Sequence, residues 1–134
     1  MCKKQIMYLE TLVISAYFDF WNDAPSQKKH TRLFWRYALN EYRIVVSDIV
    51  MSELKNFLQE KQRERFLKLV VRFPVLKLND AVEHLAEEYI NERIIPKSKK
   101  EDALHLAVCT AYGLDFLITW NQKHIVRPPK LNRF

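Results

Sequence analysis

The chain has very little glycine, with Gly113 as the single example among 134 residues. This scarcity argues against glycine-rich phosphate-binding loops and against an all-β fold that depends on many tight turns. No apolar run approaches the roughly 18 residues that a membrane span needs. The segment after Met1 also lacks the long apolar stretch of a secretory signal. These absences predict a cytoplasmic protein.

Cysteine is almost as scarce, since Cys2 and Cys109 are the two cysteines of the chain. Their spacing matches no zinc-binding pattern, and Cys109 falls on the apolar face of a predicted helix, where it would be a small core residue. Apolar residues make up 49% of the sequence, which is enough for a hydrophobic core in a chain of this length. No linker or repeat interrupts the pattern. We therefore predict a single domain over residues 1–134.

The charge balance is basic, with 22 Lys and Arg against 16 Asp and Glu, a formal net charge of +6. A basic surface favours a polyanionic partner such as a nucleic acid. A simple solvated surface is the plainer interpretation, and composition alone leaves both open.

The most informative stretch covers residues 96–121. Ser98 and Glu101 have the spacing of a capping box, and an apolar helical face follows them. Gly113 stands where a helix end favours a positive φ. The apolar run 116–119 then predicts a buried strand, which ends just before Asn121.

The rest of the chain predicts alternating elements. Further strands are expected at 6–9, 42–46 and 75–78, with helical segments at 12–20, 26–39, 48–58, 66–73 and 79–93. Ser26 is expected to cap the second helix, whose buried stripe would be Leu33, Phe34, Tyr37 and Ala38, and Ser47 to cap the third. The tail after Asn121 shows no clear element. Such alternation predicts right-handed crossovers and a parallel sheet.

Four polar residues fall at or near the carboxyl ends of the predicted strands: Glu10, Glu53, Asp102 and Asn121. Ligands of open α/β sheets bind at this edge. Carboxylates gathered there would repel one another unless a cation or a proton intervened, and oxygen ligands select Mg²⁺ or Mn²⁺ rather than zinc. Singly, each residue also has a structural interpretation, such as a favourable helix-dipole position for Asp102.

Histidines and lysines lie close to these residues in the sequence. His105 and His124 could contact a substrate or a metal ligand, although a surface or internally hydrogen-bonded histidine is the simpler interpretation. Candidate RNA contacts are Thr11, Lys99, Lys100, Thr119, Lys123 and His124.

Four segments, taken in order, resemble the motifs of the PIN-domain family, and especially the VapC-like toxins of type II toxin–antitoxin pairs. They are Tyr8-Leu-Glu-Thr11, Val46-Ser-Asp-Ile-Val-Met-Ser-Glu53-Leu, Lys100-Glu-Asp102-Ala-Leu-His-Leu-Ala and Leu117-Ile-Thr119-Trp-Asn121-Gln-Lys-His-Ile. The resemblance implies a three-layer α/β/α fold with a central, mostly parallel sheet of four or five short strands.

The resemblance also implies an Mg²⁺- or Mn²⁺-dependent endoribonuclease, with a small antitoxin as partner and a homodimer as a common state. Glu10, Glu53 and Asp102 would hold the metal, and Asn121 would assist. Three positions depart from the family pattern: Glu10 replaces the usual Asp, Leu12 follows Thr11 where a small hydroxyl residue is usual, and Asn121 replaces an acid. They keep open a second hypothesis, a catalytically weak domain that binds RNA or a partner protein. A receiver-type signalling domain is a third, disfavoured by the basic charge.

Overall fold

The computed structural model describes residues 4–57, 59–120 and 130–133. The strands are β1 (Ile6–Leu9), β2 (Arg43–Ser47), β3 (Val75–Leu76), β4 (Phe116–Thr119) and β5 (Lys130–Arg133). The α-helices are α1 (Thr11–Phe18), α2 (Pro25–Glu41), α3 (Asp48–Lys55), α4 (Glu60–Val70), α5 (Asp80–Asn91) and α6 (Lys100–Ala111), and a short 3₁₀ turn, η1 (Lys97–Lys99), precedes α6. No helix in this part of the chain is long and apolar enough to cross a membrane.

The strands form one sheet in the order β3-β2-β1-β4-β5, with β1 in the centre. Strands β1 to β4 are parallel, and β5 runs antiparallel to β4. Tyr8, in the middle of β1, lies opposite Val45 on one side and Leu117 on the other. The predicted mostly parallel sheet is therefore confirmed, with β5 as its fifth strand.

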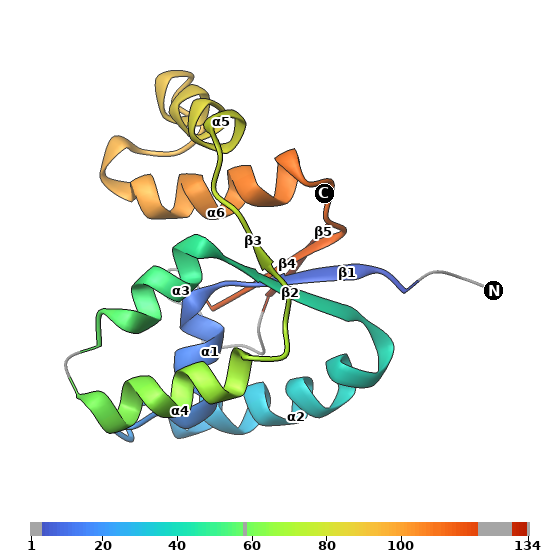
Figure 1. Cartoon of the computed structure of the whole chain (residues 1–134), viewed down its shortest axis with the longest axis vertical. Coiled ribbons are helices and arrows are strands. Elements are labelled where there is room, and N and C mark those ends of the chain that lie inside the picture. The colour runs from blue at the N-terminus through green and yellow to red at the C-terminus, as the bar shows by residue number, and fades with distance from the viewer. Residues whose placement is uncertain (1–3, 58, 121–129, 134) are drawn as a thin grey trace.

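Helices cover both faces of the sheet (Figure 1). Helices α1, α2 and α4 lie on one face, and α5 and α6 pack together over the other. The start of α1, the helix α3 and the start of α6 all lie at the edge where the parallel strands end. This three-layer arrangement brings segments far apart in the sequence to the carboxyl edge of the sheet.

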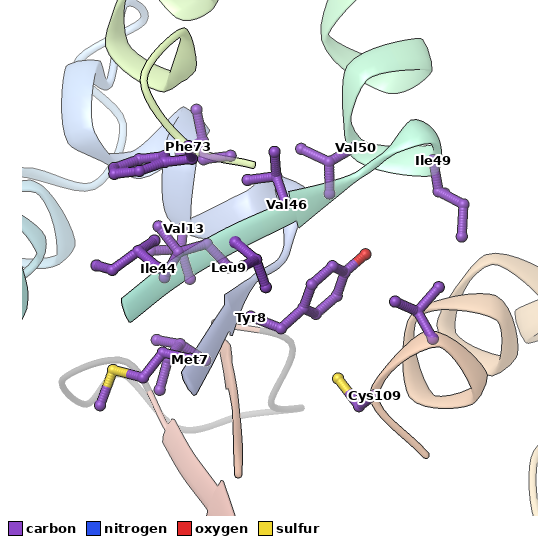
Figure 2. Close-up of a cluster of buried hydrophobic side chains, with 14 of the residues drawn as sticks. Met7, Tyr8, Leu9, Val13, Ile44, Val46, Ile49, Val50, Phe73 and Cys109 are labelled. Atoms are coloured by element: carbon purple, nitrogen blue, oxygen red, sulfur yellow. The ribbon is translucent and has the colours of Figure 1, made fainter. Parts of the chain in front are cut away.

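A continuous core fills the space between the layers. Its largest fully buried side chains include Tyr8, Met7 and Leu9 of β1, together with Phe66 of α4 and Ile118 of β4. Figure 2 shows the Tyr8 ring extending from β1 toward the side of the sheet covered by α6, the helix that carries Cys109. Cys109 is fully buried, as its apolar surroundings in the sequence predict.

Helix α2 differs from the prediction in both its start and its buried stripe. It begins with Pro25 at its first position, and Ala24 at the N-cap provides no side-chain hydrogen bond, so Ser26 does not cap it. Leu33 and Tyr37 are more than half exposed.

The residues that α2 buries are Thr31, Trp35 and Ala38. Because Thr31 is polar, the sequence does not indicate that this stripe is buried. In the structure, Thr31 Oγ1 accepts a hydrogen bond from Trp120 Nε1 at 2.8 Å and donates one to the Gln27 carbonyl at 2.6 Å. A polar residue whose hydrogen bonds are satisfied can therefore occupy a core position.

Two further predictions were wrong. Ser98 does not cap α6, because the chain enters that helix through η1, and the N-cap residue Lys99 makes no side-chain cap bond. The tail does contain an element, β5, whose backbone pairs with the outer edge of β4. Other local predictions are confirmed: Ser47 caps α3 through Val50 N–H, and Gly113 adopts a φ of +65°.

Candidate functional site

Glu10 joins β1 to α1 at the carboxyl edge of the sheet. It is the N-cap of α1, and one side-chain oxygen, Oε1, accepts the Leu12 N–H at 2.6 Å. Its own N–H donates to the Ile118 carbonyl of β4 at 3.2 Å, which ties it to the end of that strand. Only 6% of the residue is exposed, so this carboxyl group lies inside the protein.

A cavity of about 190 Å³ opens beside Glu10. Polar residues from the β1–α1 junction, α6 and β4 line it together with apolar side chains. The lining residues are Glu10, Asp102, His105, Thr119, Ile95, Leu106 and Leu117. Two of the three predicted acidic ligands, Glu10 and Asp102, therefore face one cavity.

The third predicted acid, Glu53, lies on α3 next to this cavity. Its Oε1 accepts hydrogen bonds from Thr11 Oγ1 at 2.5 Å and from His105 Nε2 at 3.0 Å. The Glu53 side chain is about one-third exposed, whereas His105 is almost fully buried. Since His105 also lines the cavity, it connects Glu53 to the space that Glu10 and Asp102 border.

The two glutamates have opposite electrostatic environments. Burial raises the pKa of Glu10 from 4.5 to about 7; His105 and the Leu12 N–H oppose this rise, and the nearby carboxylates of Glu53 and Asp102 add to it. Burial also acts to raise the pKa of Glu53, but the hydrogen bonds from His105 and Thr11 outweigh it, so the pKa of Glu53 is lowered. The edge thus holds one carboxyl group that resists ionisation and one that favours it.

The donor set of this edge suits a hard divalent cation. Burial is the main cause of the raised pKa of Glu10, and the carboxylates of Glu53 and Asp102 add to it; a cation between the three would offset that added repulsion. In the part of the chain that the structure describes, no three His, Cys, Asp or Glu side chains already stand in a metal-ligating arrangement. The joint metal role of these acids therefore stays a prediction.

The other predicted site residues fall into three groups. Thr11 and Thr119 are buried at the edge, where Thr11 bonds Glu53 and Thr119 lines the cavity. Lys99 and Lys100 are exposed at the start of α6. Asn121, Lys123 and His124 lie outside the described residues.

Sequence reasoning missed the residues that hold His105 in place. His105 Nδ1 lies 2.6 Å from the Tyr8 hydroxyl, which lies 2.7 Å from Ser47 Oγ. The internally hydrogen-bonded interpretation of His105 is thus confirmed, and its surface interpretation is wrong. One sequence feature connects His105 with the site: it follows Asp102 by three residues and so lies on the same face of the helix.

Comparison with known proteins agrees with this architecture. The chain resembles three solved structures: VapBC2 from Rickettsia felis bound to a DNA fragment from their promoter, VapC20 from Mycobacterium tuberculosis, described as a Sarcin-Ricin loop cleaving toxin, and a toxin-antitoxin complex from Klebsiella pneumoniae. The identities are 16%, 16% and 17%, and the TM-scores 0.65, 0.61 and 0.65. The matches cover 89%, 83% and 91% of this chain and 90%, 86% and 97% of those chains.

At these identities the structural likeness establishes the fold alone. A sequence comparison with curated proteins finds no match. The family model of the PIN domain, however, matches residues 7–129, which is most of the chain and includes Glu10, Glu53 and Asp102. With the α/β/α layers and the acidic edge already established, this match shows that the chain belongs to the PIN-domain family.

Proposed function

We propose that the protein is a divalent-metal-dependent endoribonuclease and the toxin of a toxin–antitoxin pair. One observation carries the proposal: Glu10 and Asp102 border a single cavity, and Glu53 is held beside it through His105. Glu10 caps α1 and Asp102 lies in the first turn of α6, but these local roles do not require acidic side chains from three separate segments to meet at one sheet edge. Binding of one Mg²⁺ or Mn²⁺ ion by all three side chains would explain why they lie at the same edge.

In this proposal Glu10, Glu53 and Asp102 hold the ion, with Asn121 assisting. The bound ion would supply the positive charge that favours deprotonation of an attacking water and stabilises the charge that develops on the phosphate. Thr119 in the cavity wall would contact the bound phosphodiester. Lys99 and Lys100, exposed beside Asp102, together with Lys123 and His124, would attract the RNA backbone.

The choice of RNA as substrate and of an antitoxin as partner rests on the structural neighbours and on charge. The Mycobacterium tuberculosis neighbour is named as a toxin that cleaves the Sarcin-Ricin loop, and the neighbours from Rickettsia felis and Klebsiella pneumoniae are toxin–antitoxin assemblies. A net charge of +6 suits a polyanionic substrate. We place the activity in the cytoplasm and expect a cognate antitoxin, with a homodimer as the free form.

The direct test compares substitutions at the acidic edge with one on the surface. Glu53→Gln and Asp102→Asn each remove a negative charge with little change in shape, so both should abolish Mg²⁺-dependent cleavage of RNA. Glu87→Gln on the exposed face of α5 is the matched control and should cleave like wild type. Unchanged cleavage in both edge variants would reject the metal role.

A second candidate function has its own support. Glu10 caps α1 with its buried side chain, and Glu10 and Asn121 stand where the family usually has Asp and an acid, which fits a domain that binds RNA or a protein without cutting. Titration with Mn²⁺ separates the two candidates. Saturable binding that Asp102→Asn removes favours the nuclease, and no binding at millimolar Mn²⁺ favours the binding domain.

The partner proposal needs a separate experiment. If a short reading frame beside this gene encodes an antitoxin, co-expression should restore growth and RNA integrity in cells that express the toxin. Size-exclusion chromatography with light scattering then gives the mass of the free protein and of the complex. Growth inhibition that the neighbour's product does not relieve would argue against the toxin–antitoxin pair.

A further inference from the structure

A buried line of polar groups runs from the core to Glu53. It links Ser47 at the end of β2, Tyr8 in the centre of β1, His105 on α6 and Glu53 on α3, at heavy-atom distances of 2.7, 2.6 and 3.0 Å. Ser47, Tyr8 and His105 are each at most 3% exposed. Four separate elements therefore contribute to one line of hydrogen bonds, which is buried from Ser47 to His105 and ends at the partly exposed Glu53.

In this line of hydrogen bonds, every proton has an acceptor when each donor points from Ser47 toward Glu53. Ser47 Oγ accepts the Val50 N–H at 3.4 Å as the helix cap, so its own proton is free to go to the Tyr8 oxygen. The Tyr8 phenol holds its proton at neutral pH and donates it to His105 Nδ1, which lies 2.6 Å from its oxygen. With Nδ1 as the acceptor, the ring proton lies on Nε2, 3.0 Å from Glu53 Oε1, a carboxylate oxygen that can only accept it.

The same geometry distinguishes the two oxygens of Glu53. Both hydrogen bonds that the described residues make to this carboxylate, from His105 Nε2 and Thr11 Oγ1, fall on Oε1. The two donors fix the plane and the rotation of the carboxylate. Oε2 accepts no hydrogen bond from the described residues and is therefore the oxygen available to a cation.

We propose that His105 is a positioning residue, held as its Nε2–H tautomer by Tyr8 and Ser47, which fixes Glu53 so that Oε2 meets the divalent ion. This inference rests on the proposed function, since it assigns Glu53 to metal binding. It assigns no bond-breaking step to His105. Its effect is to preorganise a ligand, a role whose loss generally weakens metal binding by about 10- to 100-fold.

Two near-isosteric substitutions separate the two ends of the imidazole. In His105→Gln the amide nitrogen can replace the Nε2–H donor to Glu53, whereas in His105→Asn the amide reaches Tyr8 but not Glu53. Calorimetric titration of the purified protein with Mn²⁺ should therefore give a dissociation constant raised about 10- to 100-fold in His105→Asn and clearly less in His105→Gln. Tyr8→Phe should raise it too, because the tautomer loses its partner.

His84 on α5 provides the matched control. Its side chain is largely exposed and pairs with Glu88 on the next turn, away from the acidic edge, so His84→Asn should bind Mn²⁺ like wild type. Thermal melting of each variant shows whether it is folded at the titration temperature. Wild-type affinity in a folded His105→Asn, alongside lost affinity in Glu53→Gln, would overturn the positioning role and leave the proposed nuclease intact. Absent Mn²⁺ binding by the wild type itself would instead reject the nuclease, and the positioning role with it.

A measurement without metal tests the tautomer. ¹⁵N nuclear magnetic resonance of histidine-labelled protein should show His105 protonated on Nε2 and bare on Nδ1, and Tyr8→Phe should shift it toward a mixture of tautomers. A histidine whose tautomer did not depend on Tyr8 would give the same spectrum after loss of that hydroxyl. A wild-type spectrum with the proton on Nδ1 alone would overturn the inference.

Discussion

The β1–α1 junction and the middle of α3 each bring a glutamate to the same edge of the sheet but surround it differently. Glu10 is buried and has one backbone donor, so it resists ionisation. Glu53 is partly exposed and has two side-chain donors on one oxygen, so ionisation is favoured. The difference shows that the environment of a carboxylate, more than its place at a sheet edge, decides its charge before any ion arrives.

The largest effect should come from neutralising each glutamate in metal-free protein. At pH 8 Glu10 is ionised against its environment, and the rise of its pKa from 4.5 to about 7 corresponds to up to about 3 kcal/mol. Glu10→Gln should therefore stabilise the protein by up to that amount, whereas Glu53→Gln should destabilise it by about 1 kcal/mol because its hydrogen bonds lose charge assistance. Urea unfolding in EDTA measures both, with Glu87→Gln as control. Stability changes of the same sign in Glu10→Gln and Glu53→Gln would contradict the opposite environments of the two glutamates.

The pH dependence of stability should separate the two groups. The pKa of Glu10 is raised in the folded protein, so its contribution to the free energy of unfolding is fully present below pH 4.5 and is lost as the pH rises to about 7. Relative to Glu10→Gln, the wild type should therefore lose up to about 1.4 kcal/mol per pH unit within this window. The folded pKa of Glu53 is lowered, so its contribution is lost only as the pH falls below 4.5. Parallel curves for wild type and Glu10→Gln between pH 4.5 and 7 would contradict the buried state of Glu10.

A bound divalent ion should reduce the difference between the electrostatic environments of Glu10 and Glu53. At an Mn²⁺ concentration about 100 times the dissociation constant, binding should stabilise the wild type by about 2.7 kcal/mol at pH 7.5. Glu10→Gln should gain less, because it lacks the charge that the ion offsets. Thermal melting with and without Mn²⁺ measures the gain, and an equal gain in both proteins would show that Glu10 does not bind the ion.

The smallest effect should come from Thr11, one of the two donors to Glu53. Thr11→Val keeps the shape and removes the hydroxyl, so it should cost about 1 kcal/mol and raise the pKa of Glu53 toward its ordinary value. Thr11→Ser keeps the donor and serves as the control. Equal unfolding midpoints for the two variants would mean that His105 alone determines the state of Glu53.

The sequence predicted the parts of the fold that depend on local patterns. Short apolar runs located β1 and β4 with the bounds seen in the structure, and Ser47 marked the start of α3 because a hydroxyl caps a helix locally. The stripe of α2 was not predictable in this way, since one of the two hydrogen bonds that satisfy the buried Thr31 hydroxyl comes from Trp120 in a distant part of the chain. Strand β5 forms by backbone pairing with β4, and its sequence has no periodic apolar pattern from which a strand could be predicted.

The site was predictable to a similar depth. Glu10 and Asp102 at one cavity agree with the rule that ligands gather where parallel strands end. The role of Tyr8 was not visible, because an aromatic residue in an apolar strand is expected simply to pack. Its contacts with Ser47 and His105 span 39 and 97 residues of sequence, and only tertiary structure brings such groups together.

Tyr8 fills volume at the middle of the core and also ends in a hydroxyl that continues toward the acidic edge. A change in this side chain therefore cannot be absorbed by repacking alone, since any replacement must match its size and also offer a proton at the same point. Efforts to redesign the interior should vary Tyr8, Ser47 and His105 together or leave all three untouched.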